Sequence, residues 1–267
     1  METIGKKFKS FRMIIIENDS KDGTDKSLAT FAESRPEFVE LISEKMDGKP
    51  DPNAPADPLP GDFALSALRF YKMAKLRNIY MDRLAKLPQI SQPNTLVMMV
   101  DLDLAKISIE GTLGSLSSIL AGKKKLDSDW DLVCANGLTS ECNKESVGKQ
   151  ACSFVRKDNG KFGRSYDSLA TRFTDQEMEH SFQIPAGQPR PPKFDVEWGN
   201  HQQYTRIKTN DRDADPIPAK SCFGGLAVYK AQSIKNLRYE GGDCEHISFN
   251  GKLDKVYIVP DFNTYYD

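Results

Sequence analysis

Short apolar runs alternate with amphipathic stretches along the first half of the chain. The runs at residues 13–16, 38–42 and 95–100 are rich in aliphatic side chains, and each is followed by polar residues. Runs of this length and composition predict buried strands. Residues 63–87 repeat apolar positions at helical spacing, and Thr24 stands where it can cap a second helix. The alternation predicts an α/β fold with a mixed, mostly parallel sheet flanked by helices.

The second half of the chain is more polar, and its predicted elements are shorter. Residues 131–135, 224–229 and 255–259 predict further strands, the first of them closed by an Asn-Gly pair. Two stretches, residues 49–60 and 183–215, are rich in proline and aspartate and have no periodic apolar positions. We expect both to be surface segments close to the functional site.

The charge balance removes several classes of partner. The chain carries 37 Lys and Arg against 38 Asp and Glu, a formal net charge of −1. This gives no overall field for nucleic acid or anionic lipid, so we expect neither as a partner. No apolar run reaches the ~18 residues of a membrane span, and the start lacks an apolar signal core. We therefore expect a cytoplasmic protein or a soluble fragment of a longer one.

The five cysteines form no CxxC pair, and their number is odd. This argues against a zinc site and favours reduced thiols. A bridge between Cys142 and Cys152 is the alternative. Cys134 lies inside an apolar run, which is typical of a core residue rather than a nucleophile.

An Asp-x-Asp motif follows the run at residues 95–100. Strand alternation would place Asp101 and Asp103 on one side and turn Leu102 back into the core. Two carboxylates at this spacing repel each other unless a cation lies between them. A hard divalent cation, with phosphate oxygens completing its shell, would satisfy both. The alternative is a strand-end turn with solvated aspartates.

A second polar cluster, residues 17–24, follows the first predicted strand. The N-terminus of the next helix favours an anion, and Glu17 and Asn18 could hydrogen bond to base or ribose edges. Arg77, on the predicted long helix, could turn its guanidinium towards a nucleotide diphosphate. The alternatives are a polar turn and a solvated helix face.

Three histidines are present, and one of them follows both a Gly-Gly turn and a carboxylate. His246 follows Glu245 after a Gly-Gly turn, where a metal ligand or phosphate donor is plausible. A buried structural histidine is the alternative. His180 and His201 lie in polar stretches and are predicted at the surface. The chain has no P-loop, no GxSxG elbow and no HExxH motif.

The order of the motifs adds to what each one indicates. They are Glu17-Asn-Asp-Ser-x-Asp-Gly-Thr24, Arg77-Asn78, Asp101-x-Asp103, Trp130-Asp-x-x-x-Ala-Asn-Gly137, Tyr166-Asp167-x-x-Ala170, Cys222-Phe-Gly-Gly225-x-x-x-Tyr229 and Cys244-Glu-His246. This series resembles the GT-A glycosyltransferases, in particular fungal capsule-associated mannosyltransferase-like proteins and glycosyltransferases of large algal DNA viruses. The resemblance covers about residues 11–260.

The resemblance implies a single GT-A-like, Rossmann-like domain over residues 1–267. Its nucleotide-binding part would be about residues 11–137 and its acceptor or sugar part about residues 138–267. It also implies a metal-dependent transferase with a nucleotide-sugar donor and a glycan acceptor. We favour a UDP-sugar as the donor.

The resemblance assigns roles by position. Asp103 and His246 would ligate Mn²⁺ or Mg²⁺, and Glu245 or Asp243 would be the catalytic carboxylate of an inverting enzyme. In a retaining enzyme no such base is needed, and Glu245 would contact the donor sugar. The residues expected at the donor's nucleotide and sugar are Glu17, Asn18, Asp22, Arg77, Asn78, Asp101, Phe223, Gly224 and Gly225.

Two other functions are compatible with the sequence. Enzymes that make sugar nucleotides also use α/β sheets and metal-bound carboxylates, but they carry a basic glycine-rich loop where this chain has an acidic turn. A non-catalytic carbohydrate-binding protein on the same fold is the second alternative. Metal-dependent binding of a nucleoside diphosphate separates a transferase from such a binding protein.

Overall fold

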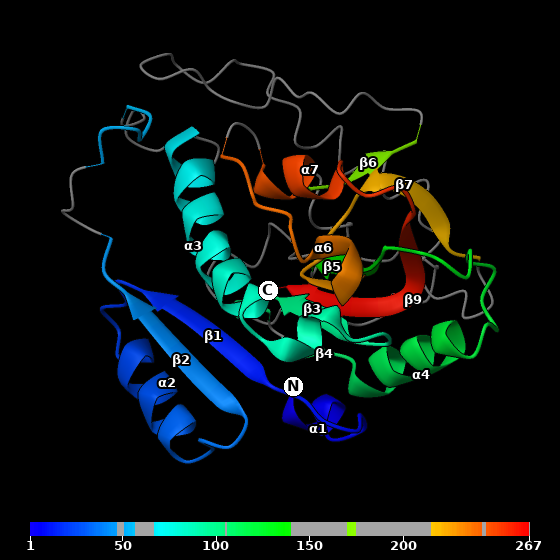
Figure 1. Ribbon diagram of the computed structural model, residues 1–267, viewed down its shortest axis with the longest axis horizontal. Coiled ribbons are helices and arrows are strands. Elements are labelled where there is room, and N and C mark those ends of the chain that lie inside the picture. The colour runs from blue at the N-terminus through cyan, green and yellow to red at the C-terminus, as the bar shows by residue number, and fades with distance from the viewer. Residues whose placement is uncertain are drawn as a thin grey trace, which may run out of the picture.

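The computed structural model describes residues 1–46, 51–56, 67–104, 106–139, 170–174, 215–241 and 244–266. A small sheet pairs β1 (Met13–Asn18) in parallel with β2 (Val39–Glu44), and seven further strands form a larger sheet. Figure 1 shows α2 (Thr24–Glu33) and α3 (Ala67–Ala85) on opposite sides of the small sheet. Because α3 also contacts α7 (Glu245–Asn250), it connects the small sheet to the larger one.

The first elements lie where the hydrophobic pattern predicts them, with one difference at the start of α2. Thr24 is already the first helical residue, so it is not the cap. Gly23 holds the N-cap position with a φ of +89°, and the Asp22 carboxylate accepts a hydrogen bond of 3.0 Å from the Thr24 N–H. The prediction of a Thr24 cap is therefore wrong by one position, because the tight turn requires a glycine there.

The predicted proline-rich loop is described only at residues 51–56, which form turns and bends without regular structure. Asp51 ties this segment to α3, accepting hydrogen bonds from Tyr71 at 2.9 Å and from Lys75 at 2.6 Å. The second predicted loop, residues 183–215, lies outside the described residues except for its last position.

The larger sheet has the order β3-β8-β5-β9-β7-β6, with β4 added on β9. Of its described pairings, β5 with β9 is parallel and the others are antiparallel. Its strands are β3 (Leu96–Val100), β4 (Lys106–Ile107), β5 (Leu132–Thr139), β6 (Arg172–Phe173), β7 (Ile217–Ser221), β8 (Leu226–Lys230) and β9 (Val256–Tyr266).

The prediction of a mostly parallel sheet is therefore wrong. An apolar run shows that a strand is buried but not in which direction it runs. Here β8, from the last fifth of the chain, lies between β3 and β5 and runs opposite to both. β5 also continues past the predicted Asn-Gly end to Thr139, because its second half pairs with β9. Strands distant in sequence thus lie next to each other within one sheet.

Both faces of the larger sheet are covered, so the first half of β5 is apolar on both of its sides. Along β5, Leu132 and Cys134 belong to the core shared with α3 and α7, whereas Val133 and Ala135 pack in the core under α4 (Ile109–Leu120). This is the period-2 alternation of a strand between two layers. Figure 1 shows α7 and α4 on opposite sides of the sheet.

The remaining helical segments are short. They are α1 (Glu2–Gly5), the 3-10 helix η2 (Pro88–Ser91) and α6 (Ala231–Ile234). None of the helices within the described ranges is both long and apolar enough to span a membrane.

One edge of the sheet gathers the polar chain segments. β3 ends there, the pairing of β5 with β8 ends there at Cys134, and β8 begins there, because β8 is antiparallel to both. Val100 pairs with Leu226, and the next residue along, Asp101, donates its N–H to the Gly225 carbonyl at 3.0 Å. The turn before β8 therefore lies directly beside the Asp-x-Asp motif.

A disulfide between Cys134 and Cys222 fixes this turn to β5, with a Cα–Cα distance of 5.9 Å. The prediction of reduced thiols is wrong for this pair. The two cysteines are 88 residues apart, and only the order of the strands brings them together. Cys244 is a buried thiol, whereas Cys142 and Cys152 lie outside the described residues.

The turn before β8 needs glycine for conformation and for space. Gly224 and Gly225 have φ values of +63° and +77°, in the left-handed region that favours glycine. A Cβ atom on Gly224 would stand 2.0 Å from the Ala135 carbonyl oxygen, which is backbone and has no rotamer to change. The turn therefore lies directly against the middle of β5.

We predict that Gly224→Ala destabilises the protein by more than about 2 kcal/mol, since left-handed strain of about 1–3 kcal/mol adds to a backbone clash. Urea unfolding measures the change. Gly114→Ala is the control, because its Cβ meets nothing within 4 Å on the exposed side of α4. There we expect a gain of up to about 1 kcal/mol from helix propensity. Equal stabilities for the two variants would contradict the described turn.

Candidate functional site

The Asp-x-Asp motif forms a turn after β3 rather than an extension of the strand. Leu102 is 64% exposed, so the expectation that it turns back into the core is wrong. Chain alternation ends with β3 at Val100, and the turn exposes the two residues that follow Asp101. The Asp101 side chain is partly covered, at 30% exposed, whereas Asp103 is exposed.

Arg77 lies at the centre of the site, buried between two carboxylates. Its Nε donates to Glu245 Oε1 at 2.8 Å, and its Nη2 donates to Asp101 Oδ1 at 3.2 Å. The Arg77 side chain is 9% exposed and that of Glu245 is 5% exposed. The structure thus brings together three predicted site residues from α3, the β3 turn and α7, which are up to 168 positions apart in sequence.

Burial and charge act in opposite directions on this network. Burial disfavours the charged guanidinium, but nearby groups, chiefly Tyr80 and Glu245, outweigh it and raise the pKa of Arg77. For Asp101, burial raises the pKa, the Arg77 charge lowers it, and repulsion from Asp103 raises it again. The net pKa of Asp101 lies above its ordinary value. A cation beside Asp101 and Asp103 would relieve this repulsion.

Aromatic rings enclose the guanidinium. The Arg77 Cζ atom lies 5.3 Å from the ring centre of Phe223 and 5.7 Å from that of Tyr239, within cation–π range. Arg77 Nη1 also donates to the Tyr80 hydroxyl at 3.3 Å. The rings restrict the conformations that the Arg77 side chain can adopt, and they shield its charge from water.

His246 packs against the same rings, and its imidazole has no hydrogen-bond partner within the described part of the chain. Its imidazole stacks on Phe223 with ring centres 3.9 Å apart and meets Tyr239 edge-on at 5.7 Å. It is 3% exposed, and both ring nitrogens lack a partner. Burial, aided by the Arg77 charge, lowers its pKa far below the ordinary value, so the ring is neutral. A neutral imidazole has a nitrogen lone pair for a ligand.

Asn78, the next residue on α3, uses its amide in both directions. Its Nδ2 donates to the Tyr239 carbonyl at 3.0 Å, and its Oδ1 accepts from the Tyr239 N–H at 2.9 Å. This clamp sets the position of the Tyr239 ring. The expected contact between Asn78 and a nucleotide stays a prediction.

The β1–α2 connection carries the remaining predicted nucleotide contacts, and it is held by its own hydrogen bonds. Glu17 is 6% exposed and accepts from Ser43 Oγ at 2.6 Å and from the Ser20 N–H at 2.8 Å. These bonds, first that from Ser43, lower the pKa of Glu17 and keep it ionised. Asn18 is exposed, and Asp22 holds the start of α2. No described hydrogen bond or ion pair of Glu17 or Asp22 reaches the Arg77 network.

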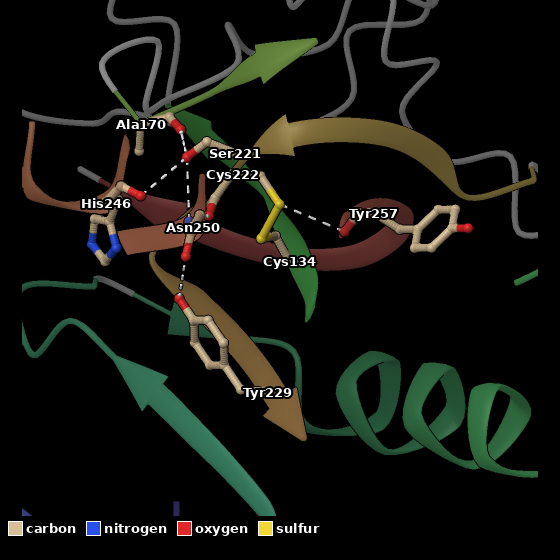
Figure 2. The surroundings of a disulfide bond; sticks show 8 residues. All are labelled: Cys134, Ala170, Ser221, Cys222, Tyr229, His246, Asn250 and Tyr257. Atoms are coloured by element: carbon tan, nitrogen blue, oxygen red, sulfur yellow. Dashed lines mark hydrogen bonds between the residues drawn. A yellow bond between two sulfur atoms is a disulfide. The ribbon is translucent and has the colours of Figure 1, made fainter. Parts of the chain in front are cut away.

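The turn that carries Phe223 is fastened from several sides, as Figure 2 shows. Besides the disulfide, Asn250 Nδ2 donates to the Cys222 carbonyl at 2.7 Å, and Asn250 Oδ1 accepts from the Tyr229 hydroxyl at 3.1 Å. Ser221 Oγ donates to the Ala170 carbonyl at 2.7 Å and contacts the His246 carbonyl at 3.3 Å. This frame presents Phe223 and His246 as a rigid pair.

The fit of a divalent cation can be judged from the donors present. No group of three or more metal-ligating side chains occurs in the described ranges, and Asp243 lies outside them. Asp103 is an exposed carboxylate beside Asp101, whose Oδ1 is already bound to Arg77. Mg²⁺ is commonly held by one or two carboxylates plus substrate phosphates, and this donor set fits that mode. It does not fit a site built from protein ligands alone.

Sequence reasoning missed several residues that shape the site, chiefly Tyr80, Tyr239 and Asn250. Tyr80 follows Arg77 at helical i,i+3 spacing, which could have indicated their contact. Nothing in the sequence around Tyr239 or Asn250 shows that each would hydrogen bond to a site residue far away along the chain.

The family relationship supports the class of activity that this geometry suggests. Residues 2–255 match the model of the family described as Cryptococcal mannosyltransferase 1. The chain therefore belongs to this family, and membership indicates glycosyltransferase activity. No curated protein matches the chain. The predicted similarity to viral enzymes and to the GT-A fold stays a prediction.

We predict that Arg77→Met costs about 3–5 kcal/mol in unfolding free energy, because it leaves buried Glu245 without its counter-charge. Adding Glu245→Gln should recover part of that loss, and a double-mutant cycle by urea unfolding measures the coupling. Arg238→Met is the control. Arg238 pairs with Asp82 on the surface, with side chains 42% and 60% exposed, and should lose less than about 1 kcal/mol. Equal losses for Arg77→Met and Arg238→Met would contradict a buried network.

Proposed function

We propose that this protein is a metal-dependent glycosyltransferase that moves a hexosyl group from a nucleotide-sugar to a hydroxyl of a glycan acceptor. The family description points to mannose as the sugar. The observation that carries the proposal is the meeting of the exposed Asp103, the Arg77-bound Asp101 and the glycine turn at one edge of the sheet. Ligands of α/β proteins commonly bind where strand ends meet in this way.

The donor would lie across this edge with its diphosphate beside Asp103. A bound Mn²⁺ or Mg²⁺ would stabilise the charge that develops on the diphosphate as the sugar leaves. Asp103 would hold that ion, and Asp101, fixed by Arg77, would be positioned for the ribose. The neutral His246 would supply a further metal or phosphate contact, which would also satisfy one of its unpartnered nitrogens.

Glu245 is the proposed general base of an inverting reaction, with Asp243 as the alternative. Arg77 Nε donates to Oε1 of the Glu245 carboxylate and so fixes the position of the group, and a general base must lie within hydrogen-bond reach of the proton that it takes. Phe223 with Gly224 and Gly225 would border the sugar, where the absence of a Cβ permits close approach. We propose Glu17, Asn18 and Asp22 for the nucleoside end.

The two alternatives make different demands on the nucleotide. A sugar-nucleotide-forming enzyme would bind a nucleoside triphosphate and release pyrophosphate, whereas a binding protein would respond to sugars but not to nucleotides. Family membership favours the transferase. A thermal-shift screen with UDP, GDP and CTP, each with and without Mn²⁺, separates all three functions, and it tests our preference for a UDP-sugar against a GDP-sugar.

We predict that Asp103→Ala removes the Mn²⁺-dependent part of nucleoside diphosphate binding and abolishes transfer. Because Asp103 is exposed, the free energy of unfolding of the variant should lie within about 0.5 kcal/mol of that of the parent. Isothermal titration with UDP and GDP, with and without metal, measures the effect. Asp254→Ala, an exposed aspartate at the opposite edge, should titrate like the parent. Unchanged metal-dependent affinity in Asp103→Ala would refute the metal assignment.

For Glu245→Gln we predict a fall in turnover of about 100-fold at saturating donor, because the amide cannot take the acceptor proton. Donor affinity should hardly change, since Gln Oε1 can still accept from Arg77. Initial rates of nucleotide release, measured alongside donor titrations, separate the two quantities. His246→Ala should instead weaken donor and metal binding first. If Glu245→Gln loses donor affinity at unchanged turnover, Glu245 belongs to the donor pocket, and the base must be sought at Asp243.

A further inference from the structure

Two buried asparagines lie side by side on neighbouring strands, near the same edge of the sheet. Asn136 on β5 is the register partner of Asn263 on β9, in the parallel pair that joins these strands. They are 1% and 8% exposed. Register partners in a parallel pair project to the same face, so the two carboxamides stand side by side.

These amides have unused hydrogen-bonding capacity. Neither Nδ2 nor Oδ1 of Asn136 has a partner within the described part of the chain, and neither does Oδ1 of Asn263. Most buried polar side-chain atoms in folded proteins are hydrogen bonded, so three such atoms in adjacent residues are unusual. Asn250 shows the ordinary case, because its amide bonds to the Cys222 carbonyl and to the Tyr229 hydroxyl.

The asparagine pair adjoins the turn that borders the proposed sugar position. Gly137, next to Asn136, lies so close to Gly224 that a Cβ would meet the Gly224 carbonyl oxygen at 3.1 Å. Thr264, next to Asn263, donates its hydroxyl to that same carbonyl. The β5–β9 register shifts between Cys134 and Asn136, where the partner changes from Ile258 to Asn263. Ala135 packs in the core under α4, so alternation along β5 directs Asn136 to the opposite face, which carries α7.

We propose that Asn136 and Asn263 form a subsite for the hydroxyl groups of a hexose ring. A carboxamide both donates and accepts, as does each sugar hydroxyl, so adjacent ring hydroxyls can satisfy all three atoms. An uncharged pair selects the sugar rather than the diphosphate. The subsite deepens the proposed transferase function, on which it rests. Because Asn136 is buried, the residues covering it must move before a sugar reaches it, and this cost weakens the binding of a single sugar.

Titration of methyl α-D-mannopyranoside, alone and with nucleoside diphosphate and Mn²⁺, tests the subsite in the full chain. We expect binding in the millimolar range that Asn136→Leu weakens about tenfold or more, the effect of losing two hydrogen bonds. The free energy of unfolding of Asn136→Leu, measured with urea, should also be no lower than that of the parent, because the substitution removes a buried amide without partners. Asn250→Leu is the matched control. Its free energy of unfolding should be lower than that of the parent, because the Asn250 amide is hydrogen bonded through both its nitrogen and its oxygen.

Two results would overturn the subsite. One is a parent protein that does not bind the mannoside under either condition. The other is an Asn136→Leu variant that binds the mannoside normally but loses as much unfolding free energy as Asn250→Leu. That result would make Asn136 a structural residue that hydrogen bonds to buried water.

Initial rates of Asn136→Leu show which sugar the pair holds. A raised KM for the nucleotide-sugar alone assigns the donor ring, and a raised KM for the acceptor alone assigns the acceptor ring. Failure of the proposed function is a separate outcome, since it appears as absence of nucleotide binding in the parent whether or not the mannoside binds.

Discussion

The site depends on one buried cation. Arg77 reaches from α3 into the space between the β3 turn and α7, and it meets a carboxylate from each. A buried ion pair rarely adds net stability, but a missing partner leaves a charge that the interior cannot solvate. Three segments distant in sequence are thereby forced into one arrangement. The rings of Phe223 and Tyr239 further restrict the position of the Arg77 guanidinium. The disulfide of Cys222 fixes the turn that carries Phe223.

Much of the fold could be predicted from local patterns, and the rest could not for a definable reason. The runs that became β1, β2 and β3 are apolar on a strand scale, and the helical spacing of α3 is plain in the sequence. Strand direction is a long-range property. The placement of β8 between β3 and β5 depends on residues more than 90 positions away, so the antiparallel sheet and the Cys134–Cys222 disulfide were both missed.

The candidate site divides in the same way. Residue types and motif order single out Asp101, Arg77, Glu245 and His246, and the structure places them together, while their roles stay predictions. The function of Asn78 in holding Tyr239, and of Asn250 in holding Cys222, lies in contacts that no local pattern encodes.

The disulfide between Cys134 and Cys222 also bears on the cellular location of the protein. Such bonds are typical of oxidising compartments, so the predicted cytoplasmic location needs an independent measurement.

We propose, as the central claim, that a metal-bound diphosphate lies at the edge of the sheet where β3 ends, where β5 stops pairing with β8, and where β8 begins. Paramagnetic broadening of backbone amide NMR signals, with Mn²⁺ and a nucleoside diphosphate added together, locates that ion directly. The account predicts strongest broadening at Asp103 and Gly225 and none at Lys255, which lies at the opposite edge beside the start of β5. Broadening centred at Lys255, or spread evenly over the protein, would contradict it.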